Sequence, residues 1–526
     1  MTWKIKDDGE TPREVYNWKM YLASICSGFG GALFGYDNAF LGGTLALPAF
    51  RSQFGLTGLS TNAVNNLSSN IIITFQAGCF VACFMSLPLA ETIGRRWTLI
   101  IASAVFSVGA ALQLTGHIAE LYPGRFLTGL GVGPLTVVVP LYISEISAPA
   151  FRGRCIGLFE VAYQLGGLLG FWINYGASLH IPASNPTQWR LPVAMQLPLI
   201  GVFFIGCIFL PETPRFLIKR NRFERAASVL SYLRNLDASH PYIQRELANI
   251  QDEVQMERTL MGVTADTSRM QVAKKTLRDC LRPKIAYRIS VGLVTQFFGQ
   301  LSGINGINYY SPEIFKSLGV VGTSTGLFAT GIYGVVKFTT AFISYFFLVD
   351  RVGRKTLLLA GAAVMFVSHI FLGAYIKVAG PGTGGDAQIT SGGIAACAFV
   401  YIYVIGFVSS FAGVPFILSA ETVPINVRAI SACLSGATQW LFNLVITKAT
   451  PYLISSIGFG TFFFFAGWVL LGAVYVWFFV PETRGIPLEH MARAFGHEDN
   501  IQDHGLYEQD KRVTDDAASA QEIDRV

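Results

Sequence analysis

The stretch Glu91-Thr92-Ile93-Gly94-Arg95-Arg96 in the first part of the chain has a counterpart, Asp350-Arg351-Val352-Gly353-Arg354-Lys355, in the second part. Two further signals repeat in the same order. Glu145 is followed seven residues later by Arg152, as Glu421 is by Arg428, and Pro211-Glu212-Thr213 matches Pro481-Glu482-Thr483. The offsets between matching signals are 259, 276 and 270 residues. These similar offsets indicate one duplication with small insertions, and a parallel repeat of this kind is typical of carriers whose binding site lies between the two copies.

Composition places the duplicated chain in a lipid bilayer. Of its 526 residues 52% are hydrophobic and only 14% are charged, and the mean hydropathy is +0.46. Apolar runs long enough to cross ~30 Å of hydrocarbon recur twelve times. They lie at about 20–43, 69–90, 97–116, 121–144, 155–177, 190–210, 286–310, 324–349, 356–378, 392–420, 431–453 and 459–480. Because lipid tolerates no unpaired backbone groups, we predict an all-α membrane protein of twelve transmembrane helices in two pseudo-symmetric six-helix halves.

Polar segments divide the chain into five parts. We predict a cytoplasmic N-terminal segment (1–19), a first half (20–210), a helical cytoplasmic linker (211–285), a second half (286–481) and a cytoplasmic tail (482–526). Basic residues gather in alternate short loops, so the positive-inside rule places both termini in the cytoplasm. The tail is acidic-leaning, and we expect it to be disordered beyond about residue 497.

Several functional classes have no support in the sequence. It contains neither a Gly-rich phosphate loop with its Lys nor a His/Cys metal cluster, so we expect no cofactor, no metal and no ATP-driven pumping. No nucleophile, base and orienting group occur together, which argues against an enzyme. The expected partners are a small solute, a proton and the bilayer, with no nucleic acid, and the chain is expected to function as a monomer.

Ordered motifs make the chain resemble the sugar porter family of the major facilitator superfamily over about residues 20–495. Besides the repeated signals, the family-like strings are Gly35-Tyr36-Asp37, Gly124-Arg125 with the glycines up to Gly133, Pro211 to Phe216, Ser302-Gly303-Ile304-Asn305 and Pro481 to Gly485. Within the family it is most similar to the fungal quinate permease branch. The strings that carry this likeness are Glu160 to Gly167, Phe171 to Gly176, Ile307 to Pro312, Gly334 to Lys337 and Gly373 to Lys377. The resemblance implies a carrier for a carbohydrate-like solute, in the plasma membrane.

Asp37 and Arg125 are the first ionisable residues that fall inside predicted spans. Asp37 lies about seventeen residues beyond the start of span 1, and Arg125 lies a few residues into span 4, which runs the opposite way. The two are therefore at comparable depth and we expect an ion pair. A carboxylate that is paired in one state and separated in another changes its proton affinity with conformation. The resemblance implies proton uptake by this acid, and the alternative is a static pair.

Lys337 lies thirteen residues before Asp350, near the middle of span 8. By resemblance it takes a place where neutral-sugar carriers usually have a substrate-facing Asn. A lysine there favours an anionic solute, because a carboxylate would offset its desolvation. The alternatives are an internal pair with Glu160 or an extended side chain along a cavity.

Glu160 in span 5 occupies, by resemblance, the place of a substrate-binding Gln. Gln164 follows one helical turn later on the same face. Either side chain could hydrogen-bond hydroxyl groups of the solute, or Glu160 is the counter-ion of Lys337 and the pocket is neutral.

Other substrate-binding candidates are carried over from matching positions in the family. They are Gln300, Asn305, Phe416, Gln439 and Asn443, which together offer amide groups and an aromatic face. Two departures argue against plain glucose: Gly299 replaces a Gln, and Phe416 replaces a Trp and so lacks the indole N–H. Each amide has the alternative role of an interhelical hydrogen bond.

Alternating charges mark the predicted cytoplasmic ends of the spans. In the family such a set closes the inner gate when the carrier faces outward, and its ion pairs between the halves would have to break during each cycle. The residues are Arg95, Glu145, Arg152, Glu212, Arg354, Glu421, Arg428 and Glu482. Arginines that merely set topology would not explain the matched glutamates.

Together these features predict proton-coupled symport of a monosaccharide, sugar acid or quinate by alternating access, with the acid favoured. One alternative is a neutral hexose or pentose carrier. The other is a non-transporting sugar sensor on the same scaffold, although the tail after Pro481 is short for a signalling domain.

Overall fold

The structure, a computed structural model, describes residues 11–148, 152–260, 269–320, 322–379, 390–484 and 495. Within the helices a few side chains, that of Arg152 among them, lie outside this description. The predicted disordered tail beyond residue 497 lies outside the described residues.

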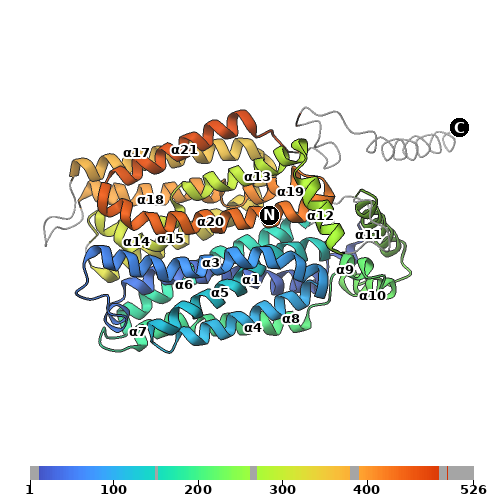
Figure 1. Cartoon of the computed structure of the whole chain (residues 1–526), viewed down its shortest axis with the longest axis horizontal. Coiled ribbons are helices and arrows are strands. Elements are labelled where there is room, and N and C mark those ends of the chain that lie inside the picture. The colour runs from blue at the N-terminus through green and yellow to red at the C-terminus, as the bar shows by residue number, and fades with distance from the viewer. Residues whose placement is uncertain are drawn as a thin grey trace.

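Long helices run side by side in two groups, one from each part of the sequence (Figure 1). The first group is α1 (Trp18–Ala46), α3 (Thr61–Ile93), α4 (Arg95–Gln113), α5 (Ile118–Ile146), α6 (Arg152–His180) and a sixth span made of α7 (Thr187–Ala194) and α8 (Gln196–Phe209). The short α2 (Pro48–Gln53) follows α1. This group is the first half that the sequence predicts.

The second group holds six spans, three of which are interrupted. They are α13 (Pro283–Leu301) with α14 (Ile304–Ser317), α15 (Thr323–Ile343) continued by the π-helical η3 (Ser344–Leu348) and α16 (Val349–Val352), α17 (Arg354–Ala379), α18 (Ser391–Ser409) with α19 (Val414–Glu421), α20 (Ile425–Ile457) and α21 (Gly460–Phe479). The predicted all-α architecture of twelve spans in two halves is therefore confirmed. Ten stretches of helix in the described chain are long and apolar enough to cross a membrane, three of which join neighbouring elements: α7 with α8, α15 with η3, and α18 with α19.

Helix ends differ from the predicted spans where polar residues extend a helix beyond its apolar core. The third helix begins at Thr61 instead of 69, and α20 begins at Ile425 instead of 431. Ser60 caps α3 by accepting a hydrogen bond from the backbone N–H of Ala63, so the helix starts at a good N-cap residue.

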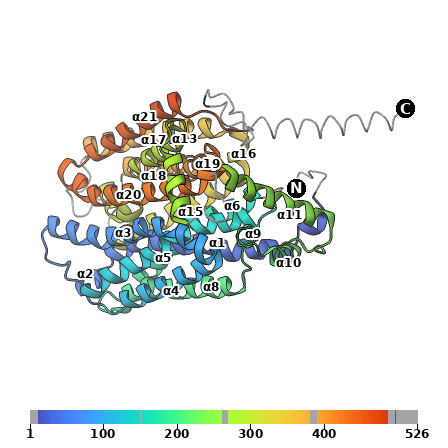
Figure 2. The ribbon, with the colours of Figure 1, turned by 45° about the vertical axis from the view of Figure 1, so that its right-hand side comes forward.

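Four linker helices gather at one end of the bundle, which we call the linker end; the opposite end is the far end (Figures 1 and 2). They are α9 (Pro214–Lys219), α10 (Phe223–Arg234), α11 (Pro241–Leu260) and α12 (Arg269–Cys280). Arg234 ties them to the first half, because its guanidinium bonds Glu246 of α11 and the carbonyl oxygen of Ile146 at the end of α5.

The halves meet along α3 with α20, α6 with α15, and α1 with α14. The views of Figures 1 and 2 agree that α3 and α20 lie side by side. Most of the described hydrogen bonds between the halves join the parts of these helices nearer the far end, for example Asn65 Nδ2 to the carbonyl oxygen of Pro451 at 3.3 Å. The structure is therefore closed between the halves at the far end.

Within the first half, glycines let α1 and α6 approach closely. A Cβ added at Gly35 would lie 1.7 Å from the carbonyl oxygen of Tyr163, and one at Gly166 would lie 1.8 Å from that of Ala32. This backbone contact fixes the position of Asp37 and Asn38 relative to α6, because both follow Gly35 within one turn.

We expect Gly35→Ala to force α1 and α6 apart and to destabilise the fold by about 1–3 kcal/mol, the usual size of an overpacking penalty. The measurement is the apparent melting temperature of the purified protein in detergent. Gly176→Ala is the matched control, since a Cβ there meets no atom within 4 Å. Equal melting temperatures for the two variants would contradict the proposed close contact.

Candidate functional site

A break in the seventh span brings two predicted site residues together. Between α13 and α14, Gly303 has φ +90°, and a Cβ there would lie 2.8 Å from the ring of Phe465. Across this break Asn305 Nδ2 donates to Gln300 Oε1 at 2.6 Å. Backbone interruptions in membrane carriers are tolerated where they line a cavity or are buried in protein, and they frequently form the solute site.

The carbonyl oxygen freed by this break is satisfied from two neighbouring helices. The hydroxyl of Tyr403 donates to the oxygen of Ser302 at 2.9 Å, and His369 Nε2 lies 2.9 Å from the same oxygen. Both side chains are buried. They therefore stabilise the break and hold Gln300 and Asn305 in place.

The expected ion pair between Asp37 and Arg125 is confirmed. Arg125 Nη1 donates to Asp37 Oδ1 at 2.8 Å, and both side chains are fully buried. The guanidinium also lies 4.5 Å from the ring centroid of Phe75 and 5.7 Å from that of Phe40. In the described part of the chain Asp37 Oδ2 has no hydrogen-bond partner, so Arg125 is the one charged group that the structure shows bound to this carboxyl group.

Asn38, the residue after Asp37, joins the two halves. Its Nδ2 donates to the hydroxyl of Tyr163 on α6 at 2.8 Å, and its Oδ1 accepts a hydrogen bond from the hydroxyl of Tyr309 on α14. Asp37, the candidate for proton binding, is thus the neighbour in sequence of Asn38. The contact of Asn38 with Tyr309 requires that the two halves lie together at this depth.

Lys337 donates its hydrogen bond to a neutral group, and the carboxylate of Glu160 lies beyond ion-pair distance but near enough to interact electrostatically. Its ammonium donates to Asn308 Oδ1 at 3.2 Å, and Tyr333 donates to the same oxygen at 2.8 Å. The rings of Tyr163 and Tyr333 lie 5.7 and 5.6 Å from the nitrogen, within the range of a cation–π contact. Among the described residues no carboxylate lies within 4.0 Å of it.

Glu160 is held by its own helix. Gln164 Nε2 donates to Glu160 Oε1 at 2.9 Å, as the spacing of one turn predicts. Glu160 is partly exposed, whereas Gln164 is buried. Its carboxylate forms no ion pair with Lys337 in this conformation, so the structure does not show the internal pair that the sequence left open.

The remaining predicted solute contacts come from the second half. Asn443 is buried and accepts a hydrogen bond from Gln76 at 2.8 Å, across the boundary between the halves. Phe416 and Gln439 are both partly exposed. Asn443 therefore takes the interhelical role that was the alternative for each amide, while Gln439 Oε1 has no hydrogen-bond partner in the described chain.

Sequence reasoning missed several residues that complete the site. They are Asn38, Gln76, Tyr163, Asn308, Tyr309 and Tyr333. Tyr163 and Asn308 fall in strings that carry the family likeness, and Asn38 directly follows another, so the signal was present. Nothing in the sequence, however, shows that Asn308 would supply the acceptor for Lys337.

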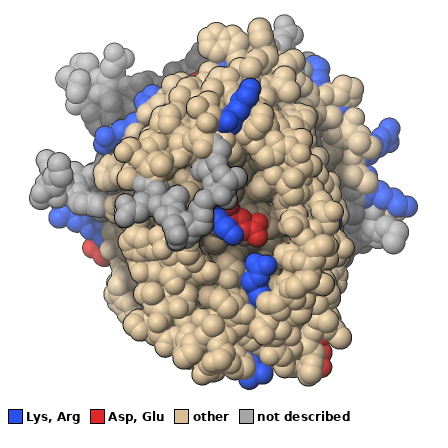
Figure 3. Space-filling model, turned by 90° about the vertical axis from the view of Figure 1, so that its left-hand side faces the viewer, with Lys and Arg blue, Asp and Glu red and all other residues tan. Residues whose placement is uncertain are grey.

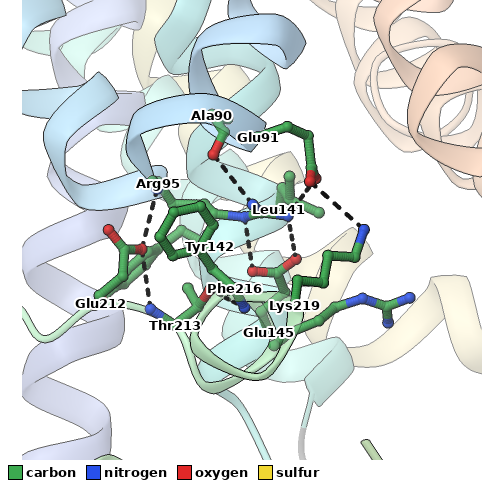
Figure 4. A network of polar contacts seen from close by, with 12 residues as sticks. Ala90, Glu91, Arg95, Leu141, Tyr142, Glu145, Glu212, Thr213, Phe216 and Lys219 are labelled. Carbon is green, nitrogen blue, oxygen red and sulfur yellow. Dashed lines mark hydrogen bonds and ion pairs between the residues drawn. The ribbon is translucent and has the colours of Figure 1, made fainter. Parts of the chain in front are cut away.

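Among the described residues, the charged side chains at the linker end pair within each half in this conformation, and not between the halves as the gate prediction has it. In the first half Arg95 binds Glu145 through two hydrogen bonds of 3.0 Å and binds Glu91 at 2.7 Å (Figure 4). In the second half Arg354 binds Glu421 at 3.1 Å. Arg428 is partly buried, and the side chain of Arg152 lies outside the described residues.

Glu212 and Glu482 have matching roles as helix caps. Glu212 accepts a hydrogen bond from the backbone N–H of Arg95 at the start of α4 (Figure 4) and a second one from that of Arg96. Glu482 does the same for Arg354 and Lys355 at the start of α17. This explains why both signals were duplicated, since each carboxylate satisfies the free N–H groups of one helix.

The glycine before each capped helix makes room for the carboxylate. Gly94 has φ +103° and Gly353 has φ +98°. A Cβ at Gly94 would lie 2.3 Å from Glu212 Oε2, and one at Gly353 would lie 2.6 Å from Glu482 Oε2. Glycine is therefore required at both positions for its backbone conformation and for its lack of a side chain.

The fold and site together define a membrane carrier built of two six-helix halves, with polar residues between them. The chain belongs to the sugar (and other) transporter family, whose model matches residues 23–495.

Curated relatives cover nearly the whole chain. A probable quinate permease of Aspergillus fumigatus is 42% identical over 489 residues, which cover 92% of this chain and 89% of the relative. The quinate permease of Neurospora africana is 39% identical over 498 residues, covering 93% and 91%. These relatives are permeases and not enzymes, so no catalytic reaction is assigned.

Solved structures share the fold. The proton:xylose symporter XylE bound to 6-bromo-6-deoxy-D-glucose superposes with a TM-score of 0.75 at 25% identity, covering 90% of this chain and 98% of that one. An inward-open form of XylE from E. coli gives a TM-score of 0.71 at 24% identity, covering 90% and 99%.

Replacing either capping glutamate by Ala is expected to destabilise the protein by about 1–2 kcal/mol, the usual cost of a lost N-cap. Burial raises the pKa of Glu212 above its usual value, so the neutral Glu212→Gln, which keeps a carbonyl acceptor, is expected to cost less than Glu212→Ala. The melting temperature in detergent measures the effect. Glu253→Ala is the control, because that carboxylate is half exposed and binds only Arg215 of the linker. A melting temperature for Glu212→Ala equal to that of the control would refute the capping role.

Proposed function

We propose that this chain is a proton-coupled symporter that carries a carbohydrate-like solute bearing a carboxylate, such as quinate or a sugar acid, by alternating access. The observation that carries the proposal is a set of buried charges: Asp37 bound to Arg125 within the first half, and Lys337, which in the described chain donates its hydrogen bond to a neutral acceptor.

Asp37 has the surroundings that proton coupling needs. In the closed arrangement Arg125 holds the carboxylate in its charged form, and the cost of burial is offset by that single partner. Separation of α1 from α5 would remove the partner and favour the protonated acid. Because Asn38 contacts Tyr309 of the other half, a shift of α1 on protonation also changes the contact between the halves. The likeness to a proton:xylose symporter supports this assignment.

Lys337 gives the site its preference for an acid. An ammonium buried among an amide oxygen and two aromatic rings is stabilised less than one in an ion pair. A solute carboxylate would supply a counter-charge in direct contact with the ammonium, which Glu160 does not give in this conformation, while Gln300, Asn305, Gln164 and Gln439 would bind its hydroxyl groups. The likeness to quinate permeases supports this solute class.

A neutral hexose or pentose carrier is the second candidate. Glu160 is partly exposed, and its carboxylate lies near enough to Lys337 for the two charges to interact. If the two charges balance each other when the solute is bound, the pocket as a whole is neutral.

Sidedness follows from the distribution of basic residues. We assign the linker end to the cytoplasm, together with both termini, by the positive-inside rule, and the protein to the plasma membrane, acting as a monomer. The far end then faces outward, and the structure represents a state that is closed to the outside. In the opposite state the charges at the linker end, Arg152 and Arg428 included, would form the inner gate.

Asp37→Asn is expected to abolish accumulation of the solute, because the amide cannot take up a proton. Labelled quinate is supplied to cells that lack carriers of their own, with and without a protonophore. The accumulation ratio is expected to fall to about one or below, the limit for a carrier without an energy source. Exchange of internal for external solute should persist, and Asp252→Asn on the exposed linker surface serves as the control. Equal accumulation of quinate by the wild type with and without the protonophore would rule out coupling of transport to the proton gradient.

Lys337→Asn distinguishes an acid carrier from a neutral carrier. Loss of a charge-assisted hydrogen bond should lower quinate uptake at least about tenfold and leave or improve uptake of neutral sugars. Lys377→Asn is the matched control, since that lysine is exposed near the far end of α17. Unchanged quinate uptake by Lys337→Asn would defeat the acid assignment.

A further inference from the structure

Lys448 lies near the far end of α20 and binds three oxygens of the other half. Its ammonium donates to Asn66 Oδ1 at 2.7 Å, to Ser69 Oγ at 3.1 Å and to Asn70 Oδ1 at 2.6 Å. All three acceptors come from the first turns of α3. One side chain of the second half therefore holds the end of a helix of the first half.

The three acceptors are all neutral. Among the described residues no carboxylate lies within 4.0 Å of the Lys448 ammonium. Hydrogen bonds from the protein thus replace the water around the ammonium, but they do not neutralise its charge. The side chain is only partly buried, which keeps the cost of this arrangement low.

This contact cannot persist through a transport cycle. Opening at the far end separates α3 from α20, and because all three acceptors lie on α3, Lys448 loses them together. The neighbouring contacts of the same boundary, from Asn65 to Pro451 and from Tyr452 to Asn66 at 3.4 Å, would be lost in the same movement. In the open state Lys448 then keeps only the ring of Tyr452, 5.6 Å away on its own helix, among the contacts that the described residues show.

We propose that Lys448 is a first binding site for the carboxylate of the transported acid when the far end is open, and that the three neutral oxygens of α3 replace the carboxylate when this end closes. The inference rests on the proposed function in that it requires an anionic solute. A charge-assisted hydrogen bond to a carboxylate is stronger than one to a neutral oxygen, so the solute binds the open state at Lys448 in preference to water.

Polar groups continue from Lys448 toward the centre. Thr447 and Asn443 precede it on α20, and both accept hydrogen bonds from Gln76 of α3, at 3.0 and 2.8 Å. Asn443 lies about 7.5 Å further along the helix axis. Opening of the boundary releases these groups as well, so the solute can exchange one set of hydrogen bonds for the next on its way to Lys337.

Charged side chains are sparse on the far end, so a cation there has few neighbouring charges to weaken its attraction for an anion. Figure 3 views this end and shows a largely uncharged surface, with a few Lys, Arg, Asp and Glu side chains around a hollow near its centre. A cation in a concave surface with few neighbouring charges raises the local concentration of an anion, and this effect weakens with salt.

The test compares Lys448→Gln, which loses the charge but keeps a hydrogen-bond donor, with Lys448→Arg, which keeps the charge. Lys377→Gln is the control for a lysine elsewhere on the far end. Initial rates of labelled quinate uptake give KM and Vmax at low and at high ionic strength, with the amount of protein at the cell surface measured for each variant.

We expect Lys448→Gln to raise KM roughly two- to fivefold at low ionic strength, the size expected for a partly exposed ion pair, and to remove most of the rise of KM with salt. Lys448→Arg should keep the wild-type salt response. A KM and a salt response equal to those of the wild type would overturn the proposal. So would a change in Vmax alone, because that result assigns Lys448 to closure of the boundary only.

Failure of this proposal differs from failure of the proposed function. If the wild type carries quinate and Lys337→Asn abolishes that uptake while Lys448→Gln behaves as wild type, only the first binding site is wrong. If the wild type carries neutral sugars and no acid, both proposals fall.

Discussion

Hydrocarbon offers no hydrogen bonds, and this constraint determines where the helical spans can be interrupted. A backbone group that leaves a helix inside the bilayer must find a partner within the protein. At the break between α13 and α14, Tyr403 and His369 provide that partner for the carbonyl oxygen of Ser302. The polar site can therefore exist only inside the bundle, where side chains from several helices converge.

Two successive residues of α1 connect the chemistry of this site to the movement of the halves. Asp37 faces Arg125 within the first half, whereas Asn38 faces Tyr163 and reaches Tyr309 of the second half. Side chains of consecutive residues on a helix point about 100° apart, so this short stretch of α1 contacts different neighbouring helices through its two side chains. Close glycine contacts with α6 prevent this stretch from moving independently.

Sequence alone predicted the twelve spans, the two halves and the ion pair of Asp37 with Arg125, because each depends on patterns along one helix or on matching depth. The breaks were not predicted. Ser302-Gly303 was recognised as a family-like string, yet the apolar run 286–310 continues through it, and only tertiary contacts reveal the interruption.

Contacts between the halves could not be predicted from the sequence either. Asn308 as the partner of Lys337, and α3 as the partner of Lys448, depend on which helix faces meet and in which conformation. Hydrophobic periodicity is weak in helices that are apolar on most sides, so it does not define those faces. The charged gate residues illustrate the same limit, since their pairing within each half follows from the fold and not from their spacing.

The paired caps at Gly94 and Gly353 have a mechanical consequence. Glu212 follows the last span of the first half and fastens the chain there to the start of α4, and Glu482 fastens the end of the last span to the start of α17 in the same manner. Each cap therefore joins two spans of one half at the linker end, and these two helix ends keep their spacing when the half moves. The caps leave α1 and α5 free to shift relative to each other, because neither helix takes part in them.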